Sequence, residues 1–222
     1  MDKVARIIET EDGSHSLYSE QFAVGYHSKY GAIQESQHVF IQAGLAPALA
    51  NKSAVRVFEM GFGSGLNAYL SLLFSNEQQK TIYFETVESF PIPLDQASVL
   101  NYASLLEGFS NDFLAFHQAP WNEPVAITPQ FTLYKKSGTI QETTLSGDFD
   151  VVFFDAFAPS SQPELWETPV LEKIYEAMAS GGIFVTYCAK GVVKRTLRAI
   201  GFQVEGIPGP PGKREMIRAI KL

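Results

Sequence analysis

The chain has 222 residues, of which 45% are hydrophobic and 18% are charged, so it can bury one large core. A formal net charge of −7 argues against nucleic-acid binding by the surface as a whole. The first residues lack the apolar run of a secretory signal, and no stretch approaches about 18 uninterrupted apolar residues. We therefore expect a soluble, cytoplasmic protein without a transmembrane helix.

The N-terminal part is expected to be an extension over residues 1–50, ahead of a main domain over 51–222. Its apolar pattern predicts short strands near 4–9 and 16–18 and a helix near 31–49.

The segment 26–38 is dense in polar and aromatic residues, and we expect it to cap a ligand pocket. It contains His27 and His38, but no third ligand is spaced for a metal, so both are interpreted as structural or lid residues. Cys188 is the single cysteine, which excludes an internal disulfide and a thiolate metal cluster. No metal site is predicted.

A glycine-rich turn is the most informative segment of the chain. A predicted buried strand over 54–60 leads into Gly61, Gly63 and Gly65, and a helix is predicted over 66–76. Glycine lets the backbone turn sharply and approach a ligand, which then meets the N-terminus of the next helix. The pattern predicts a cofactor cradle, although a plain connection between strand and helix would also fit this segment alone.

The choice of cofactor depends on the residues around the glycines. A dinucleotide-binding loop needs its third glycine one position later, where this chain has Leu66. Glu59, two positions before the first glycine, would repel a pyrophosphate and attract an ammonium group. S-adenosylmethionine carries an ammonium and a sulfonium and no phosphate, so the residues predict this cofactor.

A second strand, predicted over 81–88, ends in Glu88. In a doubly wound sheet this end lies beside the glycine turn, and its carboxylate can accept hydrogen bonds from both ribose hydroxyls. NAD also has such a ribose, so Glu88 indicates a nucleoside without choosing between the cofactors. A solvated strand end is the alternative interpretation.

The rest of the chain continues to alternate between strands and helices. Further strands are predicted near 131–135, 150–155, 182–188, 202–207 and 214–220, and helices near 93–107, 109–117, 165–179 and 190–199. The alternation predicts an α/β doubly wound, mostly parallel sheet. The last two strands should form an antiparallel hairpin at the sheet edge, which is typical of the class I methyltransferase variant of the Rossmann-like sheet. The stretch 121–124 is interpreted as an insertion or a long connection.

The strand that ends in Asp155 is expected to carry the chemistry. The carboxyl ends of parallel strands face the ligand crevice, so Asp155 should lie where a methyl group and its acceptor meet. A carboxylate there can hold an amine and take its proton. Phe157 and Trp166 would wall the acceptor pocket, or they are ordinary aromatic core.

Positive charge is concentrated at the end of the chain. Between Lys190 and Leu222, eight Lys or Arg residues stand against two acidic residues. This excess suits a local basic face that docks phosphates, and it equally suits a solvated helix with an edge strand.

The motifs occur in the order of the MnmC-like methyltransferases, and the chain resembles that family from about residue 15 onward. The resemblance rests on Gly61-Phe62-Gly63-Ser64-Gly65-Leu66-Asn67, Val87-Glu88-Ser89-Phe90-Pro91, Asp155-Ala156-Phe157-Ala158-Pro159 with Gln162-Pro163-Glu164-Leu165-Trp166, and Lys213-Arg214-Glu215-Met216. It implies methyl transfer from S-adenosylmethionine to the exocyclic amine of 5-aminomethyl-2-thiouridine at the tRNA wobble position.

The resemblance also implies a role for each matching residue. Asp155 would be the catalytic residue between cofactor and amine. Cofactor binding is implied for Glu59, Gly61, Phe62, Gly63, Gly65, Leu66, Asn67, Glu88 and Asp155. Contacts to the tRNA are implied for Phe157, Trp166, Lys190, Lys194, Arg195, Arg198, Lys213 and Arg214.

The chain departs from the family pattern at three places. It ends at Leu222 without the FAD-dependent domain of the bifunctional members, so we expect a separate enzyme to supply the aminomethyl group. Residues 135–138 read Lys-Lys-Ser-Gly, where many class I enzymes have Gly-Asp, so the residue that contacts adenine is left unassigned. In addition, Ala156 stands after Asp155 where a glycine is expected. Methylation of a small-molecule or protein amine, an NAD-dependent oxidoreductase and a non-catalytic nucleoside-binding module stay open as alternatives.

Overall fold

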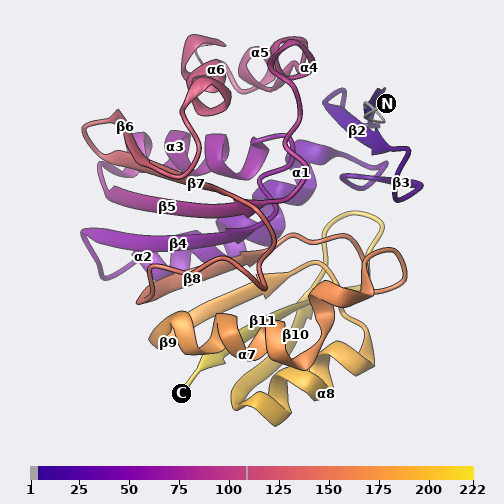
Figure 1. The fold of residues 1–222 in the computed structure, drawn as a ribbon, viewed down its shortest axis with the longest axis vertical. Coiled ribbons are helices and arrows are strands. Elements are labelled where there is room, and N and C mark those ends of the chain that lie inside the picture. Colours follow the sequence, from indigo (N-terminus) through magenta and orange to yellow (C-terminus); the bar gives the residue numbers. More distant parts are fainter. Residues whose placement is uncertain (1–4, 109) are drawn as a thin grey trace.

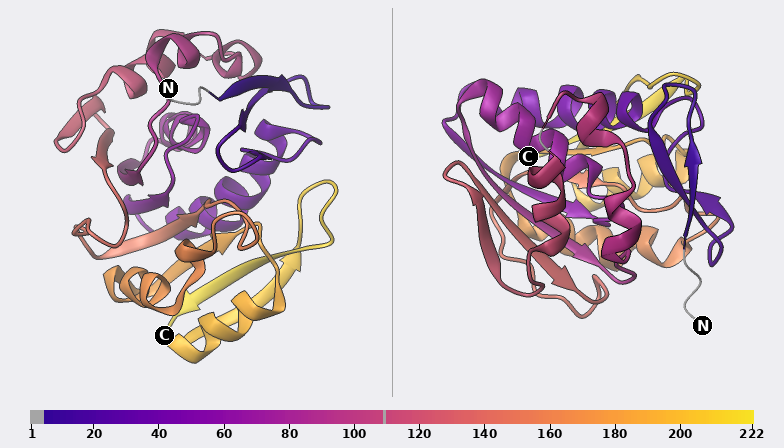
Figure 2. Two further views of the ribbon diagram at one scale, coloured as in Figure 1. Left: turned by 45° about the vertical axis from the view of Figure 1, so that its right-hand side comes forward. Right: turned by 90° about the horizontal axis from the view of Figure 1, so that it is seen from above.

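The computed structural model of the chain describes residues 5–108 and 110–222. In this part of the chain, an eight-stranded sheet forms the centre of the molecule and helices cover both of its faces (Figure 1). A three-stranded antiparallel sheet from the N-terminal segment lies to one side of it (Figure 2). Its strands are β1 (Arg6–Glu9), β2 (His15–Ser19) and β3 (Val24–Gly25).

The large sheet has the predicted mostly parallel arrangement. In spatial order its strands are β10 (Phe202–Pro208), β11 (Glu215–Lys221), β9 (Met178–Thr186), β8 (Phe149–Phe154), β4 (Ala54–Met60), β5 (Thr81–Glu88), β7 (Phe131–Ser137) and β6 (Pro124–Thr128). The strands from β9 to β7 are parallel, whereas β11 pairs antiparallel with both β9 and β10. The α/β fold class and the C-terminal hairpin are therefore confirmed.

The helices connect these strands and pack on the sheet. They are α1 (Ala32–Ser36), the π-helix η1 (Gln37–Leu45), α2 (Ala46–Leu49), α3 (Leu66–Gln78), α4 (Leu94–Ser98), α5 (Tyr102–Leu105), α6 (Ser110–Gln118), the 3-10 helix η2 (Pro163–Trp166), α7 (Thr168–Ala177) and α8 (Gly191–Ile200). The first three follow one another without a break. At Gly44 an added Cβ would lie 2.9 Å from Val185 Cγ2, so glycine lets this segment approach the sheet closely.

Two hydrophobic cores lie on opposite faces of the sheet. In β8, Val151 and Phe153 join the core beneath α3 and η1, whereas Val152 and Phe154 join the core beneath α7 and α8. Successive side chains of a strand point to opposite faces, so a strand covered on both sides is apolar at every position. This explains why residues 151–154 of β8 form an unbroken apolar run.

The helix predicted over 93–107 was wrong, because the structure has two short helices, α4 and α5, in its place. Asn101 lies between them and bonds the N-terminal sheet instead of continuing a helix. Its Oδ1 accepts from His15 N at 2.8 Å, and its Nδ2 donates to Gly13 O at 2.9 Å. A short polar side chain that bonds a distant backbone favours such a break.

The sequence missed strand β6, which begins at the end of the stretch 121–124 that was interpreted as an insertion or a long connection. The chain there enters β6, an edge strand that pairs antiparallel with β7. Pro124 is tolerated because it is the first residue of an edge strand, where no ladder hydrogen bond is needed from its nitrogen. The helix predicted over 165–179 begins instead as η2 and ends at Ala177, and β9 starts at once.

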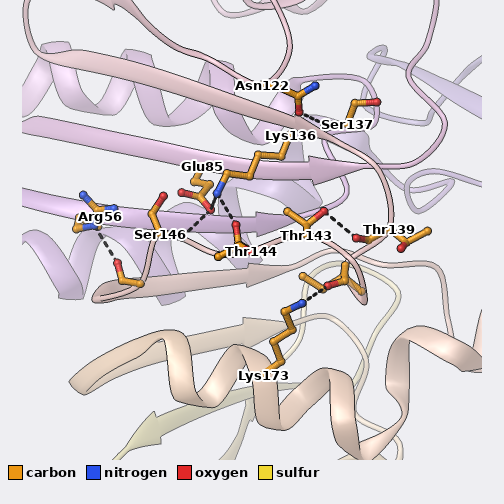
Figure 3. Close-up of polar contacts among 12 residues, drawn as sticks. Arg56, Glu85, Asn122, Lys136, Ser137, Thr139, Thr143, Thr144, Ser146 and Lys173 are labelled. Atoms are coloured by element: carbon orange, nitrogen blue, oxygen red, sulfur yellow. Dashed lines mark hydrogen bonds and ion pairs between the residues drawn. The ribbon is translucent and has the colours of Figure 1, made fainter.

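An irregular segment, residues 138–148, covers the sheet face between β7 and β8 (Figure 3). Lys136 Nζ donates to Glu85 Oε1 and to Thr144 O, each at 2.7 Å, and Ser146 N donates to the same glutamate oxygen. A buried ion pair of this kind needs such added hydrogen bonds to offset its desolvation. Lys136 therefore holds a loop in place and does not face the ligand crevice.

Candidate functional site

A cavity of about 470 Å³ lies at the carboxyl ends of β4, β5 and β8, within the size range of small-ligand sites. The glycine turn, the segment after Glu88, residues 155–157 and the N-terminal segment each contribute to its wall. Among the described residues that line it, Glu88 and Asp155 are the acidic groups and no Lys or Arg is present. The cavity is therefore suited to a ligand that carries positive charge.

The glycine turn has the geometry that the sequence predicted. Gly63 has a φ of +51°, and an added Cβ would lie 3.3 Å from the Tyr26 ring. Gly65 has a φ of +76°, and an added Cβ would lie 2.9 Å from His117 Nε2. Both positions need glycine for backbone conformation and for space. Helix α3 starts directly after this turn without a side-chain cap, which leaves its first N–H groups available to a ligand.

Glu88 lies on the cavity wall at the end of β5, as predicted. Gly63 N donates to its Oε2 at 2.9 Å, and Phe90 N donates to its Oε1 at 2.8 Å. Burial raises the pKa of Glu88, against the lowering effect of these backbone hydrogen bonds. Because an ionised carboxylate accepts about four hydrogen bonds, each oxygen keeps an acceptor site for a ligand hydroxyl.

Asp155 and Asn67 meet at the opposite side of the glycine turn. Asn67 Nδ2 donates to Asp155 Oδ2 at 2.8 Å, and both residues line the cavity. The pKa of Asp155 is raised to about 8, first by burial and then by the charge of Glu35, against the lowering effects of the Asn67 hydrogen bond and of Lys213. The carboxyl group can therefore exchange a proton near neutral pH.

Glu59 lies behind the cavity wall rather than on it. Its side chain is 1% exposed, and neither carboxylate oxygen has a hydrogen-bond partner among the described residues. Burial and the charge of Asp155 raise the pKa of Glu59 well above its usual value, although the nearby Asn67 and Thr86 side chains lower it. Glu59 therefore influences the cavity electrostatically, through its neighbours Asn67 and Asp155, rather than by direct contact.

Aromatic side chains form one side of the cavity. The Phe157 ring centroid is 5.2 Å from that of Phe22 and 5.2 Å from that of Tyr26, and Phe22 also contacts Phe90. Phe90 is half exposed at the cavity. Trp166, predicted beside Phe157, lies outside the cavity lining and donates from Nε1 to Phe157 O at 2.7 Å. It supports the wall from behind.

Sequence reasoning missed Gln96, which the structure brings to the cavity from α4. Its Nε2 donates to Ala5 O, which can only accept, so the orientation of the amide is fixed. Its Oε1 is buried beside the cavity without a partner among the described residues. An unpartnered buried acceptor is costly and points to a donor on a ligand. No local sequence signal could have found it, because only the tertiary fold brings α4 to the cavity.

Two of the predicted basic residues are engaged in ion pairs. Lys213 Nζ donates to Glu35 Oε1 and is partly buried, and Lys194 Nζ pairs with Glu215 Oε2 at 2.5 Å. The remaining predicted phosphate contacts stay exposed on or beside α8 and in the β10–β11 loop: Lys190, Arg195, Arg198 and Arg214. Lys213 is therefore an internal ion-pair partner rather than a free surface cation.

The described residues contain no group of three or more His, Cys, Asp or Glu side chains placed to hold a metal ion. In the same part of the chain, no helix is long and apolar enough to cross a membrane.

S-adenosylmethionine fits the residues that line this cavity. The turn lacks side chains where a ligand would rest, the charged lining groups are carboxylates, and an unpartnered acceptor lies at the Gln96 end. A pyrophosphate would meet negative charge here without an opposing cation in the lining, so a dinucleotide fits poorly.

Comparisons with known proteins agree with this fit. Residues 125–222 match the model of a family described as S-adenosyl-L-methionine-dependent methyltransferase. The chain is 29% identical over 221 residues to a tRNA 5-methylaminomethyl-2-thiouridine biosynthesis bifunctional protein MnmC from Marinomonas sp., with 93% of this chain and 32% of that protein covered. The protein of the same name from Aromatoleum aromaticum is 30% identical, with 96% and 35% covered. The chain thus spans about a third of the length of these relatives.

A solved structure supports the same relationship. The crystal structure of MNMC2 from Aquifex aeolicus superposes with a TM-score of 0.75 at 25% sequence identity, and the match covers 99% of this chain and 70% of that chain.

Proposed function

We propose that this chain, which is an S-adenosylmethionine-dependent methyltransferase of the MnmC type, methylates the aminomethyl group of 5-aminomethyl-2-thiouridine at the tRNA wobble position. The names of the relatives support the substrate. The observation that carries the proposal is the cavity itself, where carboxylates at the glycine turn are the charged groups of the described lining.

The residues of the glycine turn would hold the cofactor, which supplies an electrophilic methyl group on a sulfonium. Gly61, Phe62, Gly63 and Leu66 line the cavity and present backbone to it, while Gly65 shapes the turn. Glu88, kept in place by two backbone N–H groups, would accept hydrogen bonds from the ribose. Asn67 on the cavity wall and Glu59 behind it would favour the positively charged ammonium and sulfonium groups of the cofactor.

Gln96 would recognise the adenine. Its Oε1 is an acceptor whose orientation is fixed by the Ala5 carbonyl, and adenine carries an exocyclic amine that donates. This assignment replaces the contact that other class I enzymes make after the third strand, because Lys136 is committed to Glu85 in this chain.

Asp155 would hold the substrate amine and take its proton. An amine must be neutral to attack, and methylation leaves a proton to be removed. Oδ2 of Asp155 is oriented by Asn67, which leaves Oδ1 to face the amine. A pKa near 8 lets the carboxylate take a proton at neutral pH, and a positively charged cofactor next to it would favour the ionised form.

The aromatic wall would receive the unpaired base. Anticodon bases are single-stranded and stack on aromatic side chains, and Phe22, Phe90 and Phe157 supply such faces at the cavity. Lys190, Arg195 and Arg214 are exposed and would contact flanking phosphates. A tRNA substrate would place the protein in the cytoplasm, and a separate enzyme would supply the aminomethyl group.

The test is incubation with labelled S-adenosylmethionine and tRNA from cells that lack this modification, followed by nucleoside mass spectrometry. We expect label in 5-methylaminomethyl-2-thiouridine, and its formation should be at least roughly 10²-fold slower when Asp155→Asn protein replaces the wild type. Label that appears only in a protein or a small amine would support the alternative acceptors instead. Label in no acceptor at all, with intact cofactor binding, would contradict the proposal.

A further inference from the structure

We propose that Glu35 and Lys213, two residues far apart in the sequence, are positioning residues that set the protonation state of Asp155 through their ion pair. The proposal rests on the proposed function of Asp155 as the group that takes the proton from the amine. The protonation of the Asp155 carboxyl group can be measured without substrate.

The ion pair is built into the fold rather than formed at the surface. Lys213 lies in the β10–β11 loop and donates to Glu35 Oε1 on α1, and the two side chains are 29% and 8% exposed. Ser28 N donates to the second oxygen of Glu35 at 2.7 Å. The carboxylate of Glu35 is thus held from two sides, and burial makes its charge effective at longer range.

Tyr187 connects the pair to the catalytic strand end. Lys213 Nζ lies 3.9 Å from the centre of the Tyr187 ring, a cation–π contact. The Tyr187 hydroxyl donates to the carbonyl oxygen of Ala156 at 2.9 Å, directly after Asp155. One ring therefore contacts both Lys213 and the residue that follows Asp155, which connects the β10–β11 loop to the end of β8.

The electrostatic effects on Asp155 agree with this geometry. Burial raises the pKa of Asp155, Glu35 raises it further, and Lys213 lowers it. Asn67 from α3, Glu59 from β4 and Tyr187 after β9 also act on it, and the other titratable groups in the wall of the same cavity are Tyr26, His27 and Glu88. Because the two members of the pair act in opposite directions, removal of either one should unmask the effect of the other.

Contacts other than the ion pair also hold the β10–β11 loop against the N-terminal segment. A single substitution at Glu35 or Lys213 should therefore change the charge without displacing the loop. Figure 2 shows the β10–β11 loop beside this segment in both views. His38 Nε2 is 2.9 Å from Pro208 O, and Tyr30 packs so closely on Gly212 that an added Cβ would collide with its ring. The arrangement should therefore survive the loss of one charge.

The experiment is a ¹³C NMR titration of the aspartate carboxyl carbons in the full chain without ligand, with the Asp155 signal assigned by its absence in Asp155→Asn. We expect the apparent pKa of Asp155 to rise in Lys213→Met and to fall in Glu35→Gln, each by roughly half a pH unit or more. Lys213→Arg keeps the charge and should restore the wild-type value. The matched controls Arg218→Met and Glu205→Gln break another ion pair of the same hairpin, between β10 and β11, and should leave the value unchanged.

Shifts in the same direction for both variants, or no shift in a folded protein, would overturn the inference. Circular dichroism identifies any variant that fails to fold. If Lys213→Met does not fold, the decisive result is the expected fall of the Asp155 pKa in Glu35→Gln, compared with an unchanged pKa in Lys213→Arg. The apparent pKa in the pH profile of single-turnover methylation should shift in the same direction as the Asp155 pKa measured by NMR. A correct NMR result combined with no methylation of tRNA at any pH would refute the proposed function and leave the electrostatic role of the pair standing.

Discussion

Asn67 Nδ2 donates to Asp155 Oδ2 at 2.8 Å and thereby joins two motifs that are 88 residues apart in the sequence. Asn67 is the second residue of α3, directly after the glycine turn, and Asp155 follows β8. One hydrogen bond thus aligns the helix that would face the cofactor with the carboxyl group that would face the amine. Anything that displaces the turn also displaces Asp155.

Replacement of Asp155 by asparagine should slow methylation roughly 10²- to 10⁴-fold, the usual contribution of a general base. The neutral amide keeps the size of the side chain but cannot take a proton. Affinity for S-adenosylhomocysteine, measured by calorimetry, should stay within about tenfold of the wild type. A collapse of affinity with normal turnover of the bound cofactor would make Asp155 a cofactor ligand instead.

The stability of the ligand-free protein should depend on the Asp155 carboxyl group. Its pKa is about 8 in the folded state against an ordinary value of 3.8 for an aspartate, so the folded state holds the proton more tightly than the unfolded state. Stability contributed by this group is therefore lost as pH rises from about 4 to about 8. Asp155→Asn should be more stable than the wild type at pH 8 by more than about 1 kcal/mol, and the gain should shrink at pH 5.

Thermal unfolding of both proteins at the two pH values measures this difference. An equal gain at pH 5 and pH 8 would mean that the substitution acts through packing rather than through the proton.

Gly63→Ala should weaken binding of S-adenosylhomocysteine more than about tenfold, because the methyl group would enter the turn against Tyr26. Gly181→Ala is the matched control, since Gly181 also has a positive φ, of 76°, but has nothing within 4 Å of an added Cβ. Both variants should lose about 1–3 kcal/mol of stability from backbone strain. Calorimetry should then show a loss of ligand affinity in Gly63→Ala alone.

Gln96→Leu should reduce the affinity for S-adenosylhomocysteine by about 1–2 kcal/mol, because the buried amide acceptor is lost. The comparison ligand is S-inosylhomocysteine, which lacks the exocyclic amine of adenine. The wild type should discriminate between the two ligands, and the variant should bind them nearly equally. Unchanged discrimination in Gln96→Leu would show that another group reads the base.

Arg195→Ala and Arg214→Ala should weaken tRNA binding and lower the salt dependence of the affinity by about one unit of slope each. Both side chains are exposed, unlike Lys194 and Lys213, which are engaged in ion pairs. Filter binding at several salt concentrations measures the slope, and Arg218→Met serves as the control. An unchanged slope in both variants would place the phosphates on another face.

The sequence by itself determined the fold class and the position of the cavity. Apolar strands covered on both faces are legible as continuous runs, and residues 151–154 of β8 show this clearly, because burial on each side favours apolar side chains. The three glycines were equally legible, since their conformations are ones that other residues rarely adopt. Asp155 and Glu88 followed from the rule that parallel strands end at a shared crevice.

Only the tertiary structure decided which side chains reach the cavity and which positive charges are free. Gln96 and Phe22 come from segments without a motif, and their place depends on how the N-terminal sheet docks. Lys213 belongs to a basic stretch in the sequence, yet it is paired with Glu35 across the molecule. Periodicity and local motifs report the backbone of one segment, whereas the partner of a long side chain is fixed by segments that meet only when the chain has folded.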